Sequence, residues 1–189
     1  MRTRTAEETL AASACEIITE LSGEIHAART VGSLALTQPA LFQTKQPNFI
    51  VRIAVGGVVL ALRKYEDLWD YQIKTLLLRQ STSVEGTALA RELKKRKFRA
   101  FCGRVVAHYA EGNRRNPKTP LIKIEELLRD QGFESDLDFF KWTCGVLETM
   151  EKIRAKIGQK YGVEESKWKK PGAMIAANHA RKSTDDGEI

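Results

Sequence analysis

The chain has 189 residues, a hydrophobic content of 42% and a formal net charge of +7 at pH 7. This length predicts a single domain, and this much apolar sequence excludes a wholly disordered chain. The three cysteines form no CxxC pair and no Cys/His cluster, so we expect no disulfide, no metal site and no cofactor.

The sequence predicts a cytoplasmic protein without membrane contact. Its first residues contain no apolar core of the kind found in signal peptides. The most apolar run, residues 53–62, has ten residues, whereas a helix that crosses a bilayer needs about 20. We therefore expect this run to lie in a buried helix.

Apolar residues recur at helical spacing along most of the chain, and no segment alternates with period two. Thr5 and Glu8 have the spacing of a capping box, and the helix that they begin is expected to end near Val31, before a linker over residues 32–46. The other expected elements are a helix from Phe49, a shorter piece over residues 69–78, a long helix over 84–110, a short helix over 119–128 and a closing helix over 135–161 that Gly162 ends.

This pattern predicts an all-α fold, an up-and-down bundle of four main helices with one or two short extra helices. Residues 1–162 are expected to form the bundle. Residues 163–189 are charged and rich in small side chains, so we expect a mobile C-terminal tail.

The positive charge is concentrated between Arg91 and Lys118. This window contains ten Lys or Arg residues and two Glu residues, a net charge of +8, which leaves about −1 for the rest of the chain. Such a window suits the phosphate backbone of a nucleic acid, and Tyr109 is available to stack on a base. We expect Phe98 and Phe101 to be core residues instead, and Cys102 to be a small packed residue rather than a reactive thiol.

His108 is the one histidine of the basic window. On a continuous helix, Arg104 lies within about 40° of it and Lys97 lies near the same face, whereas Arg99 points about 180° away and would act from the other side or across a dimer. Histidine exchanges protons near neutral pH and arginine stabilises charge on a phosphate, which suffices for RNA cleavage without metal. A solvated basic face that ends in a histidine gives the same pattern, so both interpretations stay open.

One succession of segments resembles a known family. Residues 49–70 read as a long second helix, residues 102–109 read CGRVVAHY, and the closing helix ends with IRAKIGQKYG at residues 153–162. This order resembles the HEPN superfamily, especially its abortive-infection and toxin branches. The resemblance implies a metal-independent endoribonuclease with a role in phage defence. It also implies a homodimer with a shared cleft, and regulation by an antitoxin or another protein.

Carried over by position, His108 matches the catalytic histidine of the family. The family arginine falls on Cys102, so either Arg104 replaces it from one helical turn before His108 or the motif is inactive. The candidate catalytic residues are therefore His108 and Arg104. The candidate nucleic-acid-binding residues are Lys97, Arg99, Tyr109, Arg114 and Arg115.

Three functions are consistent with the sequence. The first is a HEPN-like ribonuclease that acts on RNA as a toxin or abortive-infection effector. The second is a catalytically inactive HEPN-like module that binds nucleic acid or a partner protein. The third is a helical interaction protein whose basic face is incidental.

Overall fold

The computed structural model describes residues 3, 5–42, 47–77, 84–114 and 124–164, and every regular element among them is helical. The predicted all-α class is therefore confirmed. The elements are α1 (Ala6–Thr37), the short 3-10 helix η1 (Pro39–Leu41), α2 (Pro47–Leu68), the π-helical turn η2 (Trp69–Ile73), α3 (Lys74–Leu77), α4 (Val84–Lys95), α5 (Phe98–Arg114), α6 (Ile124–Asp130) and α7 (Asp136–Tyr161).

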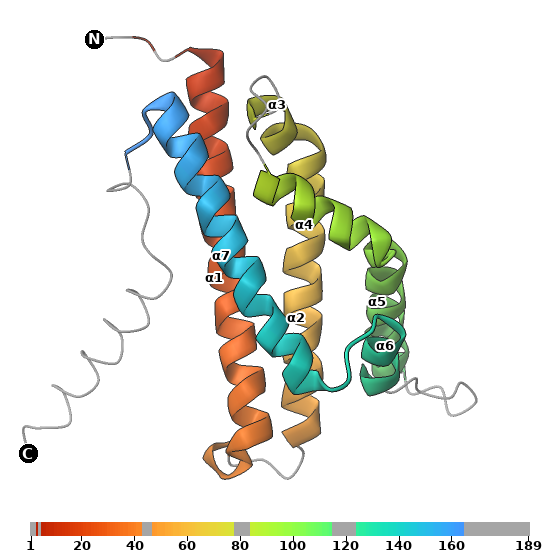
Figure 1. Cartoon of the computed structure of the whole chain (residues 1–189). Helices are drawn as coiled ribbons and strands as arrows, with labels where there is room; N and C mark the ends of the chain where they lie inside the picture. Colours follow the sequence, from red (N-terminus) through yellow and green to blue (C-terminus); the bar gives the residue numbers. More distant parts are fainter. Residues whose placement is uncertain (1–2, 4, 43–46, 78–83, 115–123, 165–189) are drawn as a thin grey trace, which may run out of the picture.

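Three long helices form the main body. α1 and α2 run side by side, and α7 crosses them obliquely (Figure 1). α4 passes from α7 across α2, and α5 continues on the side of α2 away from α1, so that α4 and α5 form a bent arm with the short α6 beside α5 (Figure 1). The predicted arrangement of four main up-and-down helices is not confirmed, because the segment expected to form one of them is divided between α4 and α5.

The predicted ends of the first and last helices can be compared directly with the structure. Thr5 and Glu8 form the capping box, with the Thr5 N–H donating to Glu8 Oε2 over 2.9 Å and the Glu8 N–H donating to Thr5 Oγ1 over 3.2 Å. α7 ends at Gly162, which adopts the left-handed conformation with φ 64°. Both predictions are confirmed.

The end predicted for the first helix near Val31 is wrong, because α1 continues to Thr37. Gly32 lies within α1, where a Cβ atom would come within 2.3 Å of the Phe140 ring and 2.9 Å of the Ala54 Cβ. Glycine therefore permits close contact of α1, α2 and α7 at this position. The packing gained there accounts for a helix that passes through a residue of low helix propensity.

The core is one apolar cluster shared by all the long helices. α1, α2 and α7 contribute fully buried side chains to it, among them Ile18, Leu62 and Ile153. The arm joins the same cluster through Leu93 and Phe101. The arm therefore belongs to the same domain as the main body.

No helix among the described residues is long and apolar enough to cross a membrane.

The helix predicted over residues 84–110 is interrupted after Lys95. Lys97 has φ 53°, and its carbonyl oxygen accepts hydrogen bonds from the N–H groups of Ala100 and Phe101, which start α5. We call this junction, residues Arg96 and Lys97, the elbow. Because of the elbow, faces calculated for one continuous helix do not apply to residues on its two sides.

Candidate nucleic-acid interface

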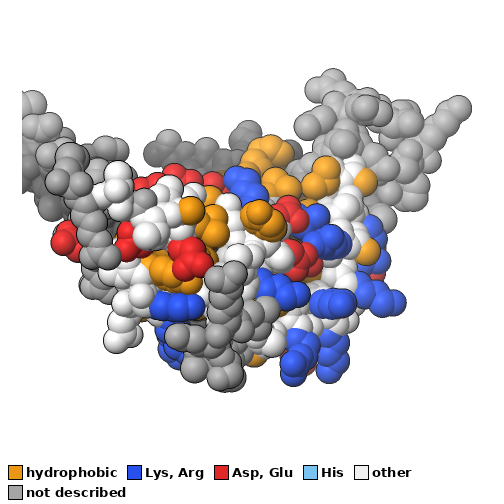
Figure 2. All heavy atoms as spheres, turned by 90° about the horizontal axis from the view of Figure 1, so that it is seen from above, with side chains coloured by type: hydrophobic (Ala, Val, Ile, Leu, Met, Phe, Trp, Pro, Cys, Tyr) orange, Lys and Arg blue, Asp and Glu red, His pale blue; other side chains and the backbone are white. Residues whose placement is uncertain are grey.

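Two grooves adjoin the elbow, and both have Lys97 and Ala100 in their walls. The first groove has a volume of about 850 Å³ and lies between the elbow and the end of α6. The second has a volume of about 870 Å³ and lies between the elbow and the end of α2. Seen from the top of Figure 1, most of the visible Lys and Arg side chains gather on one half of the surface, with Asp and Glu among them (Figure 2).

Arg96 fixes the end of α4 to α6 and α7. Its guanidinium lies 4.7 Å from the centroid of the Phe133 ring and 5.6 Å from that of Trp142. Its Nε donates to Glu92 Oε1 over 3.2 Å, and its Nη1 donates to the Gln131 carbonyl oxygen. Trp142 Nε1 donates to the same Glu92 oxygen over 3.0 Å. The Arg96 guanidinium therefore makes its contacts with other residues of the protein.

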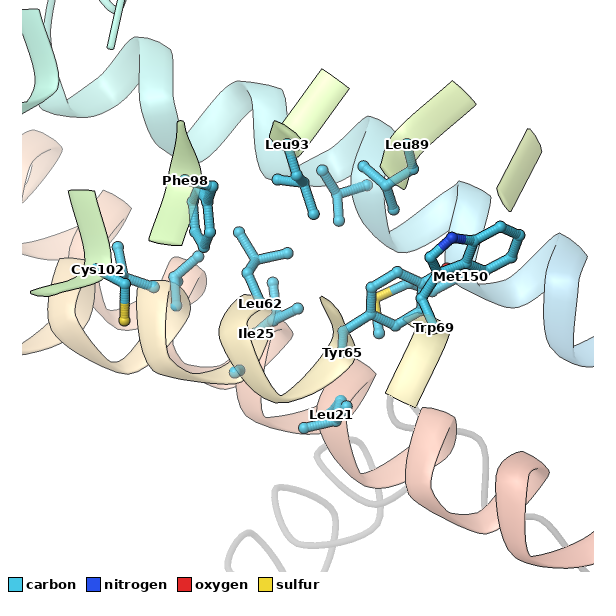
Figure 3. Packing of buried hydrophobic residues seen from close by; sticks show 14 of the residues in the cluster. Leu21, Ile25, Leu62, Tyr65, Trp69, Leu89, Leu93, Phe98, Cys102 and Met150 are labelled. Atoms are coloured by element: carbon cyan, nitrogen blue, oxygen red, sulfur yellow. The ribbon is translucent and has the colours of Figure 1, made fainter. Parts of the chain in front are cut away.

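Phe98 fixes the start of α5 to α2. Its side chain is 3% exposed and packs edge-on against Phe101, with the ring centroids 5.6 Å apart. Figure 3 shows Phe98 pointing toward Leu62 of α2, on the same side of α2 as Leu93 of α4. The prediction that Phe98 and Phe101 are core residues is confirmed, and the elbow is held by packing on both sides.

Arg99 faces the acidic end of α2. Its Nε donates to Glu66 Oε1 over 3.2 Å, its Nη2 donates to Asp70 Oδ2 over 2.6 Å, and Asp67 lies 4.0 Å away. The hydrogen bond to Glu66 is the largest of the effects that raise the pKa of Arg99 above its usual value. Arg99 lines the second groove together with Lys97, and its guanidinium contacts carboxylates of its own chain.

Arg104 lines the first groove and is held less tightly than Arg96 and Arg99. Its Nη1 lies 3.8 Å from Asp130 Oδ2, and its side chain is 45% exposed. With the Gln131 amide oriented so that both its ends meet complementary groups, the amide oxygen accepts from Arg104 Nη2 over 3.3 Å. These contacts hold Arg104 at the groove wall.

The predicted stripe of Lys97, Arg104 and His108 along one helix is wrong for Lys97, which belongs to the elbow and not to α5. The first groove nevertheless brings Lys97 and Arg104 together, because both residues line it. The backbone of α5 is helical through Arg114, so Arg104 and His108 are one helical turn apart. The side chains of His108, Tyr109 and Arg114, and the whole of Arg115, lie outside the described residues.

The side chains of several cations around the grooves form no ion pair or hydrogen bond with another described residue. They are Lys74, Arg91, Lys94 and Lys97 at the second groove, and Lys95 with Lys97 at the first. Glu66 and Asp70 also line the second groove, but both bind Arg99. The described charges of the second groove therefore leave a net excess of three positive charges, since five cations face two carboxylates.

Cys102 is buried beside the α2–α5 contact, as expected of a small packed residue. Burial raises the pKa of its thiol, and this effect outweighs the opposite influence of Arg63. Cys102 is thus not an activated thiol. Among the described residues, no group of three or more His, Cys, Asp or Glu side chains is placed to bind a metal ion.

The sequence alone did not identify the acidic partners of Arg99, which are Glu66 near the end of α2 and Asp70 in η2. Their spacing was a usable signal, since Glu66 and Asp70 are four residues apart and lie on the same side of a helix. What the sequence did not provide was the pairing of this side with α5.

Comparisons with models of known protein families, with curated protein sequences and with solved structures found no match for this chain.

Proposed function

We propose that this chain is a HEPN-like module that binds RNA through the grooves on either side of its elbow. The observation that carries the proposal is the set of groove cations without a described carboxylate partner: Lys74, Arg91, Lys94, Lys95 and Lys97. Like charges held close together repel one another, and an anion bound among them relieves the repulsion. A phosphate backbone supplies such anions at regular intervals.

Binding of this kind has a distinct thermodynamic signature. Each phosphate neutralised by a Lys or Arg side chain releases counterions, so the logarithm of the affinity falls with the logarithm of the salt concentration, by about 0.7 per contact for a single strand. Contacts with phosphates carry little sequence information. We therefore expect binding that is strongly salt-dependent and tolerant of sequence.

The test measures fluorescence anisotropy of a labelled RNA at several salt concentrations. The double substitution Lys94→Gln with Lys95→Gln removes two groove cations, and the control Lys141→Gln with Lys152→Gln removes two exposed lysines of α7 that line neither groove. We expect the groove variant to reduce the salt slope by about 1.4 and the control to leave it nearly unchanged. Equal effects of the two double substitutions contradict the proposal.

The second candidate function is metal-independent cleavage of the bound RNA. It is favoured by the position of Arg104, which lines the first groove and precedes His108 by one turn of α5. In this mechanism the His108 imidazole removes the proton of a ribose 2′-OH, and the 2′ oxygen attacks the adjacent phosphorus. The 5′ oxygen leaves and takes up a proton from water, a 2′,3′-cyclic phosphate forms, and Arg104 stabilises the negative charge that develops on the phosphate oxygens.

Cleavage is tested with purified protein and RNA in the presence of EDTA. Cleavage activity that is lost in both His108→Ala and Arg104→Ala supports the ribonuclease. Binding without cleavage shows that the protein is an RNA-binding module and not a ribonuclease. A poor yield of the wild-type protein that His108→Ala restores supports a role as a toxin or abortive-infection effector. An antitoxin or other regulatory protein is then the expected partner.

The homodimer implied by the resemblance is part of this proposal. The exposed apolar residues Phe49, Ile53 and Leu60 are spaced so that they project from one side of α2. A dimer that buries this side is expected to dissociate when Ile53 is replaced by Asp, which sedimentation velocity measures. A wild-type protein that sediments as a monomer at every concentration contradicts the dimer and leaves RNA binding to be tested alone.

A further inference from the structure

Lys97 is the one non-glycine residue with a positive φ among the described residues. α4 ends at Lys95, and Lys97, two residues later, has φ 53°, whereas the residues with positive φ after α6 and α7 are Gly132, with φ 86°, and Gly162, with φ 64°. The left-handed conformation is unfavourable for a residue with a Cβ atom, and glycine or asparagine usually occupies this position at the end of a helix. The elbow therefore carries a lysine where the backbone favours glycine.

The fold explains the conformation of Lys97 but not its side chain. Arg96 is held by Phe133 and Trp142, and Phe98 is buried against Phe101, so the backbone between these two residues has little freedom. The side chain of Lys97 is exposed and forms no ion pair with a described residue. Packing and internal charge thus give no reason for a lysine at this position.

The location of Lys97 supplies a reason. It lines both grooves, so its ammonium group is available at the point where they meet. α5 starts directly after it and has no acidic residue in its first turn, so no first-turn carboxylate compensates the positive end of that helix dipole. An anion at the elbow would be attracted both by the ammonium group and by the start of α5.

We propose that Lys97 anchors a backbone phosphate of single-stranded RNA where the strand passes from one groove to the other. This inference rests on the proposed RNA binding and adds the class of nucleic acid and the residue at the centre of its path. A strand that occupies both grooves passes over the elbow from the α6 side to the α2 side, because Lys97 and Ala100 line both grooves and the other walls differ. A double helix bends smoothly only over many base pairs, so a single strand suits this path better.

The decisive variant is Lys97→Gly, because stability and RNA affinity should change in opposite directions. Glycine relieves the left-handed conformation, so we expect a higher midpoint of urea unfolding. Loss of the ammonium group should weaken binding of single-stranded RNA on the order of tenfold at moderate salt and reduce the salt slope by about 0.7. Lys97→Asn, which tolerates the same conformation, should show the same loss of affinity, whereas Lys97→Arg should keep the salt slope.

Each result decides a specific claim. If the wild-type protein binds no RNA, the proposed function fails. If the wild-type protein binds RNA and both Lys97→Gly and Lys97→Asn bind it with unchanged affinity and salt slope, only the role of Lys97 is overturned. A lower urea midpoint for Lys97→Gly would contradict the left-handed elbow, and duplex RNA that binds as tightly as the single strand would overturn the choice of substrate.

Discussion

The α2–α5 contact and the elbow take their positive charge from the same basic run, residues 94–99, but use it differently. At the α2–α5 contact, Arg99 binds Glu66 and Asp70 of its own chain. At the elbow, Lys97 forms no ion pair with any described residue and faces two grooves. The net charge of the run therefore overstates the charge that is available to a ligand.

The difference follows from the chemistry of the two side chains. A guanidinium is planar and has five N–H donors, so one arginine can bind two carboxylates or stack on rings while it donates hydrogen bonds. Arg96 and Arg99 are used in these two ways. A lysine ammonium is a strongly hydrated point charge that suits a phosphate at a solvent-exposed position. The comparison predicts that the arginines of the run stabilise the fold and that its lysines bind the ligand.

The largest expected effect belongs to Arg96. We expect Arg96→Ala to lower the free energy of unfolding by about 2–3 kcal/mol, because it removes two ring contacts and leaves Glu92 without its guanidinium partner. Arg96→Lys should recover little of this loss, since an ammonium cannot stack and bind in the same geometry. Urea denaturation measures both.

The control is the neighbouring exposed residue Lys95, for which substitution by alanine should change the free energy of unfolding by less than about 0.5 kcal/mol. If Lys95→Ala destabilises the protein as much as Arg96→Ala does, the proposed difference between the arginines and the lysines of the run is contradicted.

A smaller loss of stability is expected for Arg99→Ala, because the side chain is 54% exposed and solvent screens its charge. The loss arises mainly from Glu66, which is 8% exposed and would retain only the longer contact with Arg63, at 3.8 Å. A double-mutant cycle with Glu66→Gln measures this coupling, which should be favourable. If Arg99→Ala leaves stability unchanged but weakens RNA binding as much as Lys97→Gly, Arg99 is an RNA contact, as the sequence analysis predicted.

Much of the fold could be predicted from the sequence. Thr5 and Gly162 mark helix ends through local chemistry, a capping box and a left-handed glycine, and both are where they were expected. The elbow could not be predicted, because KKRKFR contains no glycine, proline or asparagine to interrupt a helix. The break arises from tertiary contacts of Arg96 and Phe98, and these contacts override the local helix propensity.

The candidate site was predictable only as a region. The count of basic residues located the charge, but the partners of Arg99 lie 33 and 29 residues earlier in the chain, so no local pattern shows that this charge is neutralised. Arg104 illustrates the opposite case. Its one described ion pair, with Asp130, is long and exposed, so its charge stays accessible from the first groove.

The smallest expected effect on stability is that of Arg104→Ala. The Arg104–Asp130 pair spans 3.8 Å, with the side chains 45% and 62% exposed, and pairs of this kind contribute less than about 0.5 kcal/mol. We expect a change in the free energy of unfolding within that limit, and a coupling near zero in a double-mutant cycle with Asp130→Asn. This result would allow a loss of RNA cleavage in Arg104→Ala to be assigned to the chemical step rather than to the fold. A loss of stability above about 1.5 kcal/mol would instead make Arg104 a structural residue like Arg96, and the cleavage mechanism would lose its phosphate-stabilising group.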